Sequence, residues 1–296
     1  MHHIILGAGP AGVIAAETIR KHAPADTITL VGDEKEPPYS RMAIPYLLIG
    51  NVGERGTYLR KSLTHFEDLK IKQVNARALS VDSAGKTVTL SDGATLSFDR
   101  LLIATGSHPM RPPISGMDLP GIHPCWTLED ARAIQKLATK GARVLQMGAG
   151  FIGCIIMEAL AARGVTLSVV EMGDRMVPRM MGPTAGGMIK DWCTAKGVQV
   201  FTGTKVESIE KGSGGAALKV KLSNGQAMDV DLVISATGVR PAIGFLEKSG
   251  IKCLLGVLTD EHLQTSVPGI YAAGDCAEAF DKVSGKTIVS AIQPNA

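Results

Sequence analysis

The sequence has few aromatic residues and little net charge. Phe, Trp and Tyr make up 4% of the 296 residues, and Lys plus Arg exceed Asp plus Glu by only 31 − 28 = 3. Single-stranded nucleic acids are bound through aromatic stacking in a basic groove, and nucleic acids and anionic membranes attract strongly basic surfaces. The composition therefore predicts no nucleic-acid partner and no membrane partner.

Long apolar segments and closely spaced cysteines are also missing. The longest uncharged apolar stretches, residues 4–16 and 144–157, are shorter than the roughly 18 residues of a membrane span. No basic segment of a secretory signal precedes the first of them. The five cysteines are odd in number and widely separated, and the seven histidines form no HxxxH or HExxH pair. We therefore expect reduced thiols, no metal site and a cytoplasmic protein.

Glycine is the residue in excess, and it is placed in a repeated pattern. Gly accounts for 34 of the 296 residues, above the roughly 7% of average usage. An apolar strand at residues 3–6 precedes the turn Gly7, Gly9, Gly12, a helical segment, and a strand ending at Asp33 and Glu34. A second copy has a strand at 143–147, the turn Gly148, Gly150, Gly153, a helix to about residue 163, and a strand ending at Glu171.

Each glycine of this pattern has its own physical reason. The first makes a tight turn, the second lets the backbone approach a pyrophosphate, and the third lets helix and strand pack closely. The helix N-terminus offers unpaired N–H groups to the phosphates, and the later acid accepts hydrogen bonds from a ribose. Two complete copies predict two dinucleotide sites.

Other segments repeat as well and suggest a duplicated chain. Residues 88–93 match 220–225, and Ala104-Thr105-Gly106 matches Ala236-Thr237-Gly238. The Asp-Gly and Asn-Gly pairs at 92–93 and 224–225 are typical of hairpin turns. We therefore predict an α/β protein with two Rossmann-like three-layer domains, each with a β-meander inserted before its last strand.

These motifs together resemble the FAD-dependent pyridine nucleotide-disulfide oxidoreductases, the two-dinucleotide-binding-domain flavoproteins. The resemblance rests on both glycine turns, on the two Ala-Thr-Gly motifs and on Ala272-Ala273-Gly274-Asp275. Residues 37–41 and 107–113 look most like the ferredoxin/rubredoxin reductase and NADH-nitrite reductase flavoprotein branch. The resemblance implies an FAD domain split between residues 1–111 and 242–296, with an NAD(H) domain at 112–241 inserted into it.

The resemblance also implies the cofactor-binding residues and leaves the choice between Asp33 and Glu34 open for the FAD ribose. Asp275 would hold the ribityl chain or a phosphate of FAD. The residues implied for FAD are Gly7, Gly9, Pro10, Ala11, Gly12, Asp33, Glu34, Arg41, Ala78, Ala104, Thr105, Gly106, Gly274 and Asp275. Those implied for NAD(H) are Gly148, Gly150, Phe151, Ile152, Gly153, Glu171 and Gly238. Because a carboxylate repels a 2′-phosphate, Glu171 predicts NADH rather than NADPH.

The sequence departs from the family where disulfide chemistry would occur. Met42 aligns with the redox cysteine of the disulfide reductases, and methionine forms no thiolate. Tyr46 and Ile155 stand where many relatives have a Lys–Glu pair near the flavin. We therefore name no catalytic side chain, since the cofactors carry hydride transfer themselves.

Three functions remain open. The leading one is an FAD-dependent oxidoreductase that passes a hydride from NADH to flavin and electrons to a redox protein, partner domain or partner subunit. The alternatives are an NADH oxidase that releases peroxide and a non-catalytic flavin- or nucleotide-binding subunit of a larger complex. Relatives continue into a C-terminal interface domain, so the resemblance implies a truncated second FAD segment and a homodimer only if that domain is supplied.

Overall fold

Both glycine-rich turns lie where the sequence predicts them, each between the first strand of a parallel sheet and a helix. The computed structural model describes residues 1–213, 215 and 217–289. The chain forms two units, one of residues 1–40, 58–108 and 240–296 and one of residues 41–57 and 109–239. Each unit contains one of the two turns.

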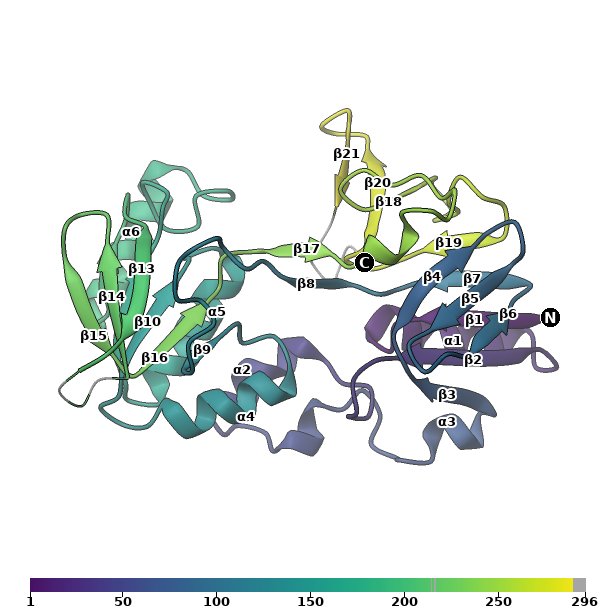
Figure 1. Cartoon of the computed structure of the whole chain (residues 1–296), viewed down its shortest axis with the longest axis horizontal. Helices are drawn as coiled ribbons and strands as arrows, with labels where there is room; N and C mark the ends of the chain where they lie inside the picture. Colours follow the sequence, from purple (N-terminus) through teal and green to yellow (C-terminus); the bar gives the residue numbers. More distant parts are fainter. Residues whose placement is uncertain (214, 216, 290–296) are drawn as a thin grey trace. The chain divides into compact units, whose positions relative to one another are not determined.

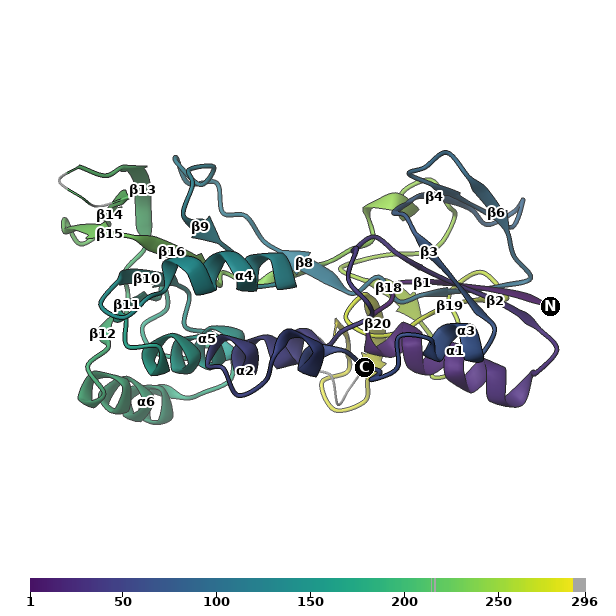
Figure 2. The same cartoon turned by 90° about the horizontal axis from the view of Figure 1, so that it is seen from below.

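The first unit is built on a five-stranded parallel sheet (Figure 1). Its strands, in spatial order, are β3 (Ile71–Asn75), β2 (Thr27–Gly32), β1 (His2–Leu6), β7 (Arg100–Ile103) and β19 (Ile270–Ala272). Strands β1 and β2 are apolar on both faces because both are covered, as in parallel sheets generally. Figure 2 places α1 (Pro10–His22) on one face and the β4–β6 meander on the other.

Alternate residues of β1 pack into two different hydrophobic clusters of this unit, because successive side chains of a strand point to opposite faces of the sheet. Ile5 packs with Val13 of α1 in one cluster, which also takes in Phe66 of α3 (His65–Asp68). Ile4 packs in the other cluster with Val88 of the meander. The meander strands are β4 (Ala78–Asp82), β5 (Thr87–Leu90) and β6 (Thr95–Ser97).

The second unit repeats this arrangement. Its strands, in spatial order, are β12 (Gln199–Phe201), β11 (Thr166–Val170), β10 (Arg143–Met147), β16 (Leu232–Ser235) and β9 (Ile122–His123). The meander is β13 (Val206–Lys211), β14 (Leu218–Leu222) and β15 (Ala227–Val230), and its apolar residues share a core with the sheet. The helices are α4 (Leu128–Leu137), α5 (Phe151–Ala162) and α6 (Pro183–Ala195). The predicted hairpin turns are present in both meanders, and the predicted duplicated α/β fold is confirmed.

The remaining strands connect and complete these units. Strands β8 (Ser107–Pro109) and β17 (Val239–Pro241), each at one of the four points where the chain passes from one unit to the other, pair as a two-stranded sheet. In the first unit, β18 (Val257–Thr259), β20 (Ala277–Asp281) and β21 (Lys286–Val289) form a small sheet after η3 (Gly244–Leu246). The buried carboxylate of Glu278 closes this sheet, since it accepts hydrogen bonds from the Gly256 amide and the Thr287 hydroxyl.

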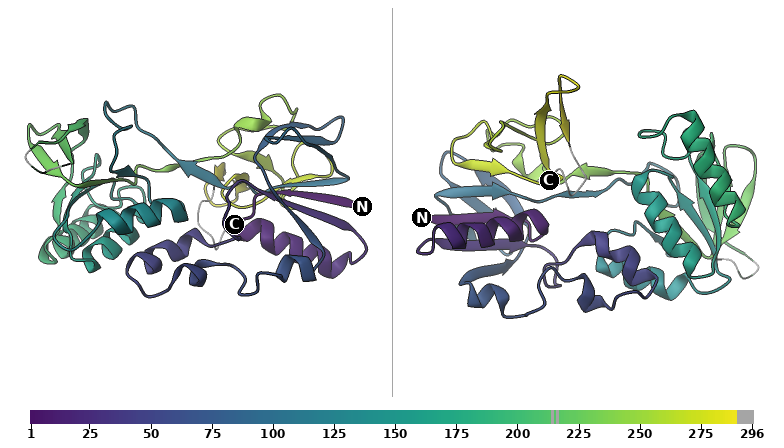
Figure 3. Two further views of the ribbon diagram at one scale, coloured as in Figure 1. Left: turned by 60° about the horizontal axis from the view of Figure 1, so that its bottom comes forward. Right: turned by 180° about the vertical axis from the view of Figure 1, so that it is seen from behind.

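One segment differs from the predicted domain boundaries. Residues 41–57, expected within the FAD domain, group with the second unit. They form η1 (Arg41–Ala43), α2 (Ile44–Leu48) and η2 (Glu54–Thr57), and α2 packs against α4 and α5 (Figure 3). Arg163 at the end of α5 donates to the carbonyls of Leu48, Gln135 and Ala138, which ties three helix C-termini together. The assignment of 1–111 with 242–296 to FAD and of 112–241 to NAD(H) stays a prediction.

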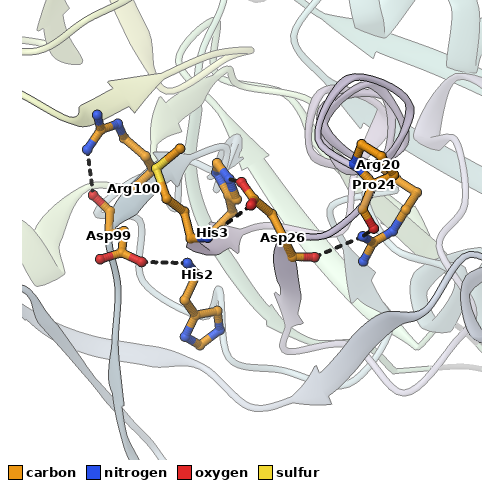
Figure 4. Close-up of polar contacts among 8 residues, drawn as sticks. His2, His3, Arg20, Pro24, Asp26, Asp99 and Arg100 are labelled. Atoms are coloured by element: carbon orange, nitrogen blue, oxygen red, sulfur yellow. Dashed lines mark hydrogen bonds and ion pairs between the residues drawn. The ribbon is translucent and has the colours of Figure 1, made fainter.

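The start of β1 is anchored by ion pairs (Figure 4). The carboxylate of Asp26 binds the imidazole of His3 at 2.7 Å and the terminal amine of Met1 at 2.9 Å. The Arg20 guanidinium donates to the carbonyls of Pro24 and Asp26, and the Asp99 carboxylate accepts from the amide of His2. These contacts hold the start of β1, the central strand that leads into the first turn.

We expect Asp26→Asn to lower the melting temperature by a few degrees at pH 7. The hydrogen bond from His3, followed by that from the N-terminus, lowers the pKa of Asp26 below its ordinary 3.8. A lowered native pKa stabilises the fold above pH 3.8, and this contribution is lost as the pH falls through the native value. In thermal melts, the difference between the two proteins should therefore persist from pH 7 down to about pH 3.8 and shrink as the pH falls further. A difference that stays constant below pH 3.8 would contradict the assignment.

None of the helices in the described part of the chain has the length and apolar character that a membrane crossing needs.

Candidate cofactor sites

The first turn is held by backbone contacts that only glycine permits. Gly7 has a φ of +115°, and a Cβ there would lie 2.0 Å from the carbonyl oxygen of Ala104. A Cβ on Gly12 would lie 1.9 Å from the carbonyl oxygen of Gly7, so helix α1 meets the turn at its third glycine. The amide of Gly7 donates to the carbonyl of Val31 at 2.8 Å. The turn is thereby fixed to both β7 and β2.

The second turn repeats these contacts in the other unit. Gly148 has a φ of +95°, and a Cβ there would lie 2.3 Å from the carbonyl oxygen of Ala236. A Cβ on Gly153 would lie 2.6 Å from the carbonyl oxygen of Gly148, and the Gly148 amide donates to Val170 at 2.8 Å. The two Ala-Thr-Gly motifs therefore have a common role, because each supplies the carbonyl against which a first glycine packs.

The middle glycine of each turn is different and faces open space. A Cβ on Gly9 or on Gly150 would meet no atom within 4 Å. Each of these glycines is the N-cap of its helix, and neither helix has a side-chain cap or an acidic residue in its first turn. Such helix ends carry unpaired N–H groups and the positive end of the helix dipole. Both turns therefore fit a dinucleotide pyrophosphate, FAD at one and NAD(H) at the other.

In the second unit, the acid that follows the second strand of the repeat is Glu171, and hydrogen bonds hold its carboxylate in place. One carboxylate oxygen of Glu171 accepts from the amide of Ala149, inside the turn, and the other from the amide of Gly173, both at 2.7 Å. The nearby basic residue Arg175 is engaged within its own loop, donating to Asp174 and to the carbonyls of Pro178 and Met181. The second site therefore presents the Glu171 carboxylate, while the Arg175 guanidinium is held within its own loop.

In the first unit the two candidate acids have different environments. Asp33 follows β2 directly, is 46% exposed and pairs with Arg77 at 3.0 Å. Glu34 is held by its neighbours, since its carboxylate accepts from the Tyr39 hydroxyl and its carbonyl from Asn75. An ion pair on an exposed carboxylate is weak, so Asp33 is the acid more readily turned toward a ribose.

Asp275, predicted to bind FAD, lies beside Ser107 of β8 within the first unit. The Ser107 hydroxyl donates to the Asp275 carboxylate at 3.0 Å, and Ser107 is buried. The carbonyl of Gly106 accepts from the amide of Ala242, and the Thr105 hydroxyl donates to the Ala242 carbonyl. A Cβ on Gly274 would lie 3.3 Å from the side chain of Ala11, which brings this motif next to the first turn.

The other predicted residues are distributed over both units. Pro10 opens α1, Ala78 opens β4, and Gly238 accepts through its carbonyl from Met110 in the second unit. Phe151 and Ile152, at the start of α5, are 44% and 36% exposed. Arg41 falls in the second unit, where its guanidinium donates to the carbonyl of Trp126 and lies over the indole ring. Its assignment to FAD stays a prediction.

The surroundings of the five cysteines disfavour thiolate chemistry. All five are free, and burial is the main cause that raises the pKa of each thiol, to about 12 for Cys125 and about 11 for Cys154. At neutral pH they are therefore thiols rather than nucleophilic thiolates. Within the described ranges, no three His, Cys, Asp or Glu side chains are grouped to hold a metal ion. Met42 and Tyr46, at the positions of the missing cysteine and lysine, are 50% and 55% exposed.

Two residues of these sites were missed by sequence reasoning. Ser107 orients Asp275, and its partner is 168 positions away, so no local pattern indicates it. Gln146 lies at the base of the second turn and bonds to two of its carbonyls. The signal for Gln146 was available, because it is an uncharged polar residue between the apolar residues Leu145 and Met147 of the strand.

Comparison with known proteins agrees with this geometry. Residues 1–294 match the family Pyridine nucleotide-disulphide oxidoreductase. The chain belongs to this family. The predicted resemblance is thereby confirmed, as are the oxidoreductase class and the use of FAD and NAD(H) that characterise the family.

Three similar proteins differ in what their names say they do. An NADH oxidase from Methanocaldococcus jannaschii is 34% identical over 98% of this chain and 66% of its own length. A subunit epsilon of NADH-dependent phenylglyoxylate dehydrogenase from Aromatoleum evansii is 30% identical over 99% of this chain and 69% of its own. A putidaredoxin reductase–putidaredoxin complex has a TM-score of 0.94 at 26% identity, covering 99% of this chain and 72% of the other. This chain therefore spans about two thirds of the length of its curated relatives.

Proposed function

We propose that this chain transfers a hydride from NADH to FAD and that the reduced flavin passes electrons on to an acceptor. FAD would be held by the first turn, with Asp33 or Glu34 at its ribose and Asp275 at its ribityl chain or phosphate. NADH would be held by the second turn, with Glu171 at its ribose. The observation that carries this proposal is the pair of matching turns, each with an open middle glycine and an uncapped helix N-terminus.

The protein's part in the reaction is positioning. When bound, FAD supplies the chemistry that accepts a hydride and releases electrons, and no protein acid or base is needed for the hydride step. The glycine turns bind the phosphates through backbone N–H groups, and Ser107 holds the Asp275 carboxylate. Because all five thiols are free and burial raises the pKa of each, electrons would leave the flavin directly rather than through a disulfide.

The acceptor we propose is a redox protein, a partner domain or a partner subunit. A structural neighbour is in complex with putidaredoxin, and a relative is named as a subunit of a dehydrogenase. A second candidate is direct transfer to oxygen, which is favoured by the 34% identical protein named NADH oxidase. Since no cysteine is placed to process peroxide, an oxidase built on this chain would release hydrogen peroxide.

An anaerobic NADH titration of the FAD-loaded chain tests the hydride step. We expect the visible absorption of the flavin to bleach at about one equivalent of NADH, because hydride transfer reduces the flavin stoichiometrically. FAD that stays bound but is not bleached would contradict the proposal and favour a non-catalytic nucleotide-binding subunit.

The two acceptors are separated by a second measurement on the same protein. Oxygen consumption with NADH alone, accompanied by equivalent hydrogen peroxide, should be slow beside the NADH-dependent reduction of a small iron–sulfur protein. Equal rates would favour the oxidase.

A further inference from the structure

Gln146 is a fully buried amide at the base of the second glycine turn. It lies in β10, two residues before Gly148, and has 0% exposure. Its Nε2 donates two hydrogen bonds of 2.9 Å, one to the carbonyl of Gly148 and one to the carbonyl of Gly153. Both N–H groups of the amide are thus used. The Gln146 side chain joins the first and the third glycine of the turn.

The duplicated first unit has an apolar residue at this place. Ile5 stands two residues before Gly7, as Gln146 stands two residues before Gly148. A Cβ on Gly12 would lie 3.2 Å from Cγ2 of Ile5, and a Cβ on Gly153 would lie 3.0 Å from Nε2 of Gln146. The two side chains therefore fill the same space under the third glycine. The turn itself forms with isoleucine there, and the amide is an addition.

The amide in the second unit is not explained by stability. The Oε1 atom of Gln146 is buried and has no hydrogen-bond partner among the described residues. A buried acceptor without a partner disfavours the folded state, whereas an isoleucine of similar size would bury only apolar surface. A buried amide whose oxygen has no hydrogen-bond partner therefore needs a reason other than packing.

The difference between the two ligands provides that reason. FAD is a resident cofactor and supports its own turn while bound. NADH enters and NAD⁺ leaves in every catalytic cycle, so the second turn must keep its shape while empty. A turn that is already ordered binds its ligand more tightly, because binding does not have to order it. The two hydrogen bonds of Gln146 order the backbone of this turn from beneath.

We propose that Gln146 is a positioning residue that keeps the second turn in its pyrophosphate-binding shape between turnovers and so sets the affinity for the pyridine nucleotide. This inference rests on the proposed binding of NADH at that turn. Gln146 does not touch the reacting atoms. Its loss should therefore weaken nucleotide binding and leave the hydride step of the bound complex unchanged.

The test uses two variants. Gln146→Ile places in the second unit the residue that the first unit has at the matching position, and Gln146→Met keeps the side chain long and flexible. NADH and NAD⁺ are titrated into the full 296-residue chain by calorimetry or by NADH fluorescence. We expect Kd to rise about tenfold, the effect of losing about one net hydrogen bond. The bleaching rate at saturating NADH and the FAD content should stay the same, and the melting temperature should stay equal or rise. Ile5→Val, the matched position in the first unit, should leave the Kd for NADH unchanged.

Several results would overturn the inference. An unchanged Kd in both variants would show that the amide does not order the turn for its ligand. A weaker Kd accompanied by a lower melting temperature in both variants would assign Gln146 a packing role only. Failure of the unmodified chain to bind NADH at all would contradict the proposed function itself, so the two failures are distinguishable.

Discussion

Replacing Gly9 with valine is expected to abolish FAD binding while leaving the chain folded. Gly9 has φ −77° and ψ −176°, an extended conformation that any residue adopts, and a Cβ there would meet no atom within 4 Å. The new side chain would project into the space where the pyrophosphate approaches the backbone. Losing two charge-assisted hydrogen bonds, at about 1.5–3 kcal/mol each, would weaken FAD binding by at least about 10²-fold.

The duplicated chain supplies the matched control for this variant. Gly150 has nearly the same conformation, φ −72° and ψ −174°, and the same open surroundings. Gly150→Val should therefore retain FAD and lose binding of NADH, measured as absence of bleaching at NADH concentrations that reduce the unmodified protein. Thermal melts without ligand should match for all three proteins. Loss of FAD in the Gly150 variant instead would reverse the assignment of the two turns.

The second large effect is expected in the choice between NADH and NADPH. We expect the double variant Glu171→Ala with Met172→Arg to change the ratio of kcat/KM for NADH and NADPH by about 10²-fold or more. The carboxylate of Glu171 repels a 2′-phosphate, and its removal also takes away an acceptor for the ribose hydroxyl. Met172 is 75% exposed directly after it, so an arginine there would be free to pair with the phosphate.

The single variant Met172→Leu is the control, since it keeps the carboxylate and adds no charge. Its preference for NADH should equal that of the unmodified chain. The measurement is initial-rate kinetics with each nucleotide and a common acceptor. Comparable efficiency of the unmodified chain with both nucleotides would remove the basis for the prediction, and so would a double variant that still prefers NADH.

The glycine turns and the hairpins could be predicted from the sequence because their causes are local. A strand, a glycine turn and a helix follow one another within about twenty residues, and the order and spacing of these elements are enough to mark the turn. The Asp-Gly and Asn-Gly turns of the two meanders are local in the same way. Glu171 could be predicted as a ribose acid because its distance from the turn is set by one helix and one strand.

Segment 41–57 could not be placed from the sequence, because its position depends on contacts between distant residues. Arg132 pairs with Glu54, Arg163 donates to the Leu48 carbonyl, and Arg41 donates to the Trp126 carbonyl. These partners are 78, 115 and 85 positions apart. Nothing in the periodicity of either segment indicates such a pairing.

The chain's local chemistry thus specifies two dinucleotide turns and a family, and it predicts that no cysteine is redox-active. Tertiary structure decided which groups are free to act at those turns. Arg175 is near Glu171 in sequence, yet three hydrogen bonds keep it in its own loop. Gln146 is one polar residue in an apolar strand, and only folding brings its amide to two carbonyls of the turn. The physical reason is that backbone conformation follows from neighbours along the chain, whereas hydrogen-bond partners follow from how distant segments pack.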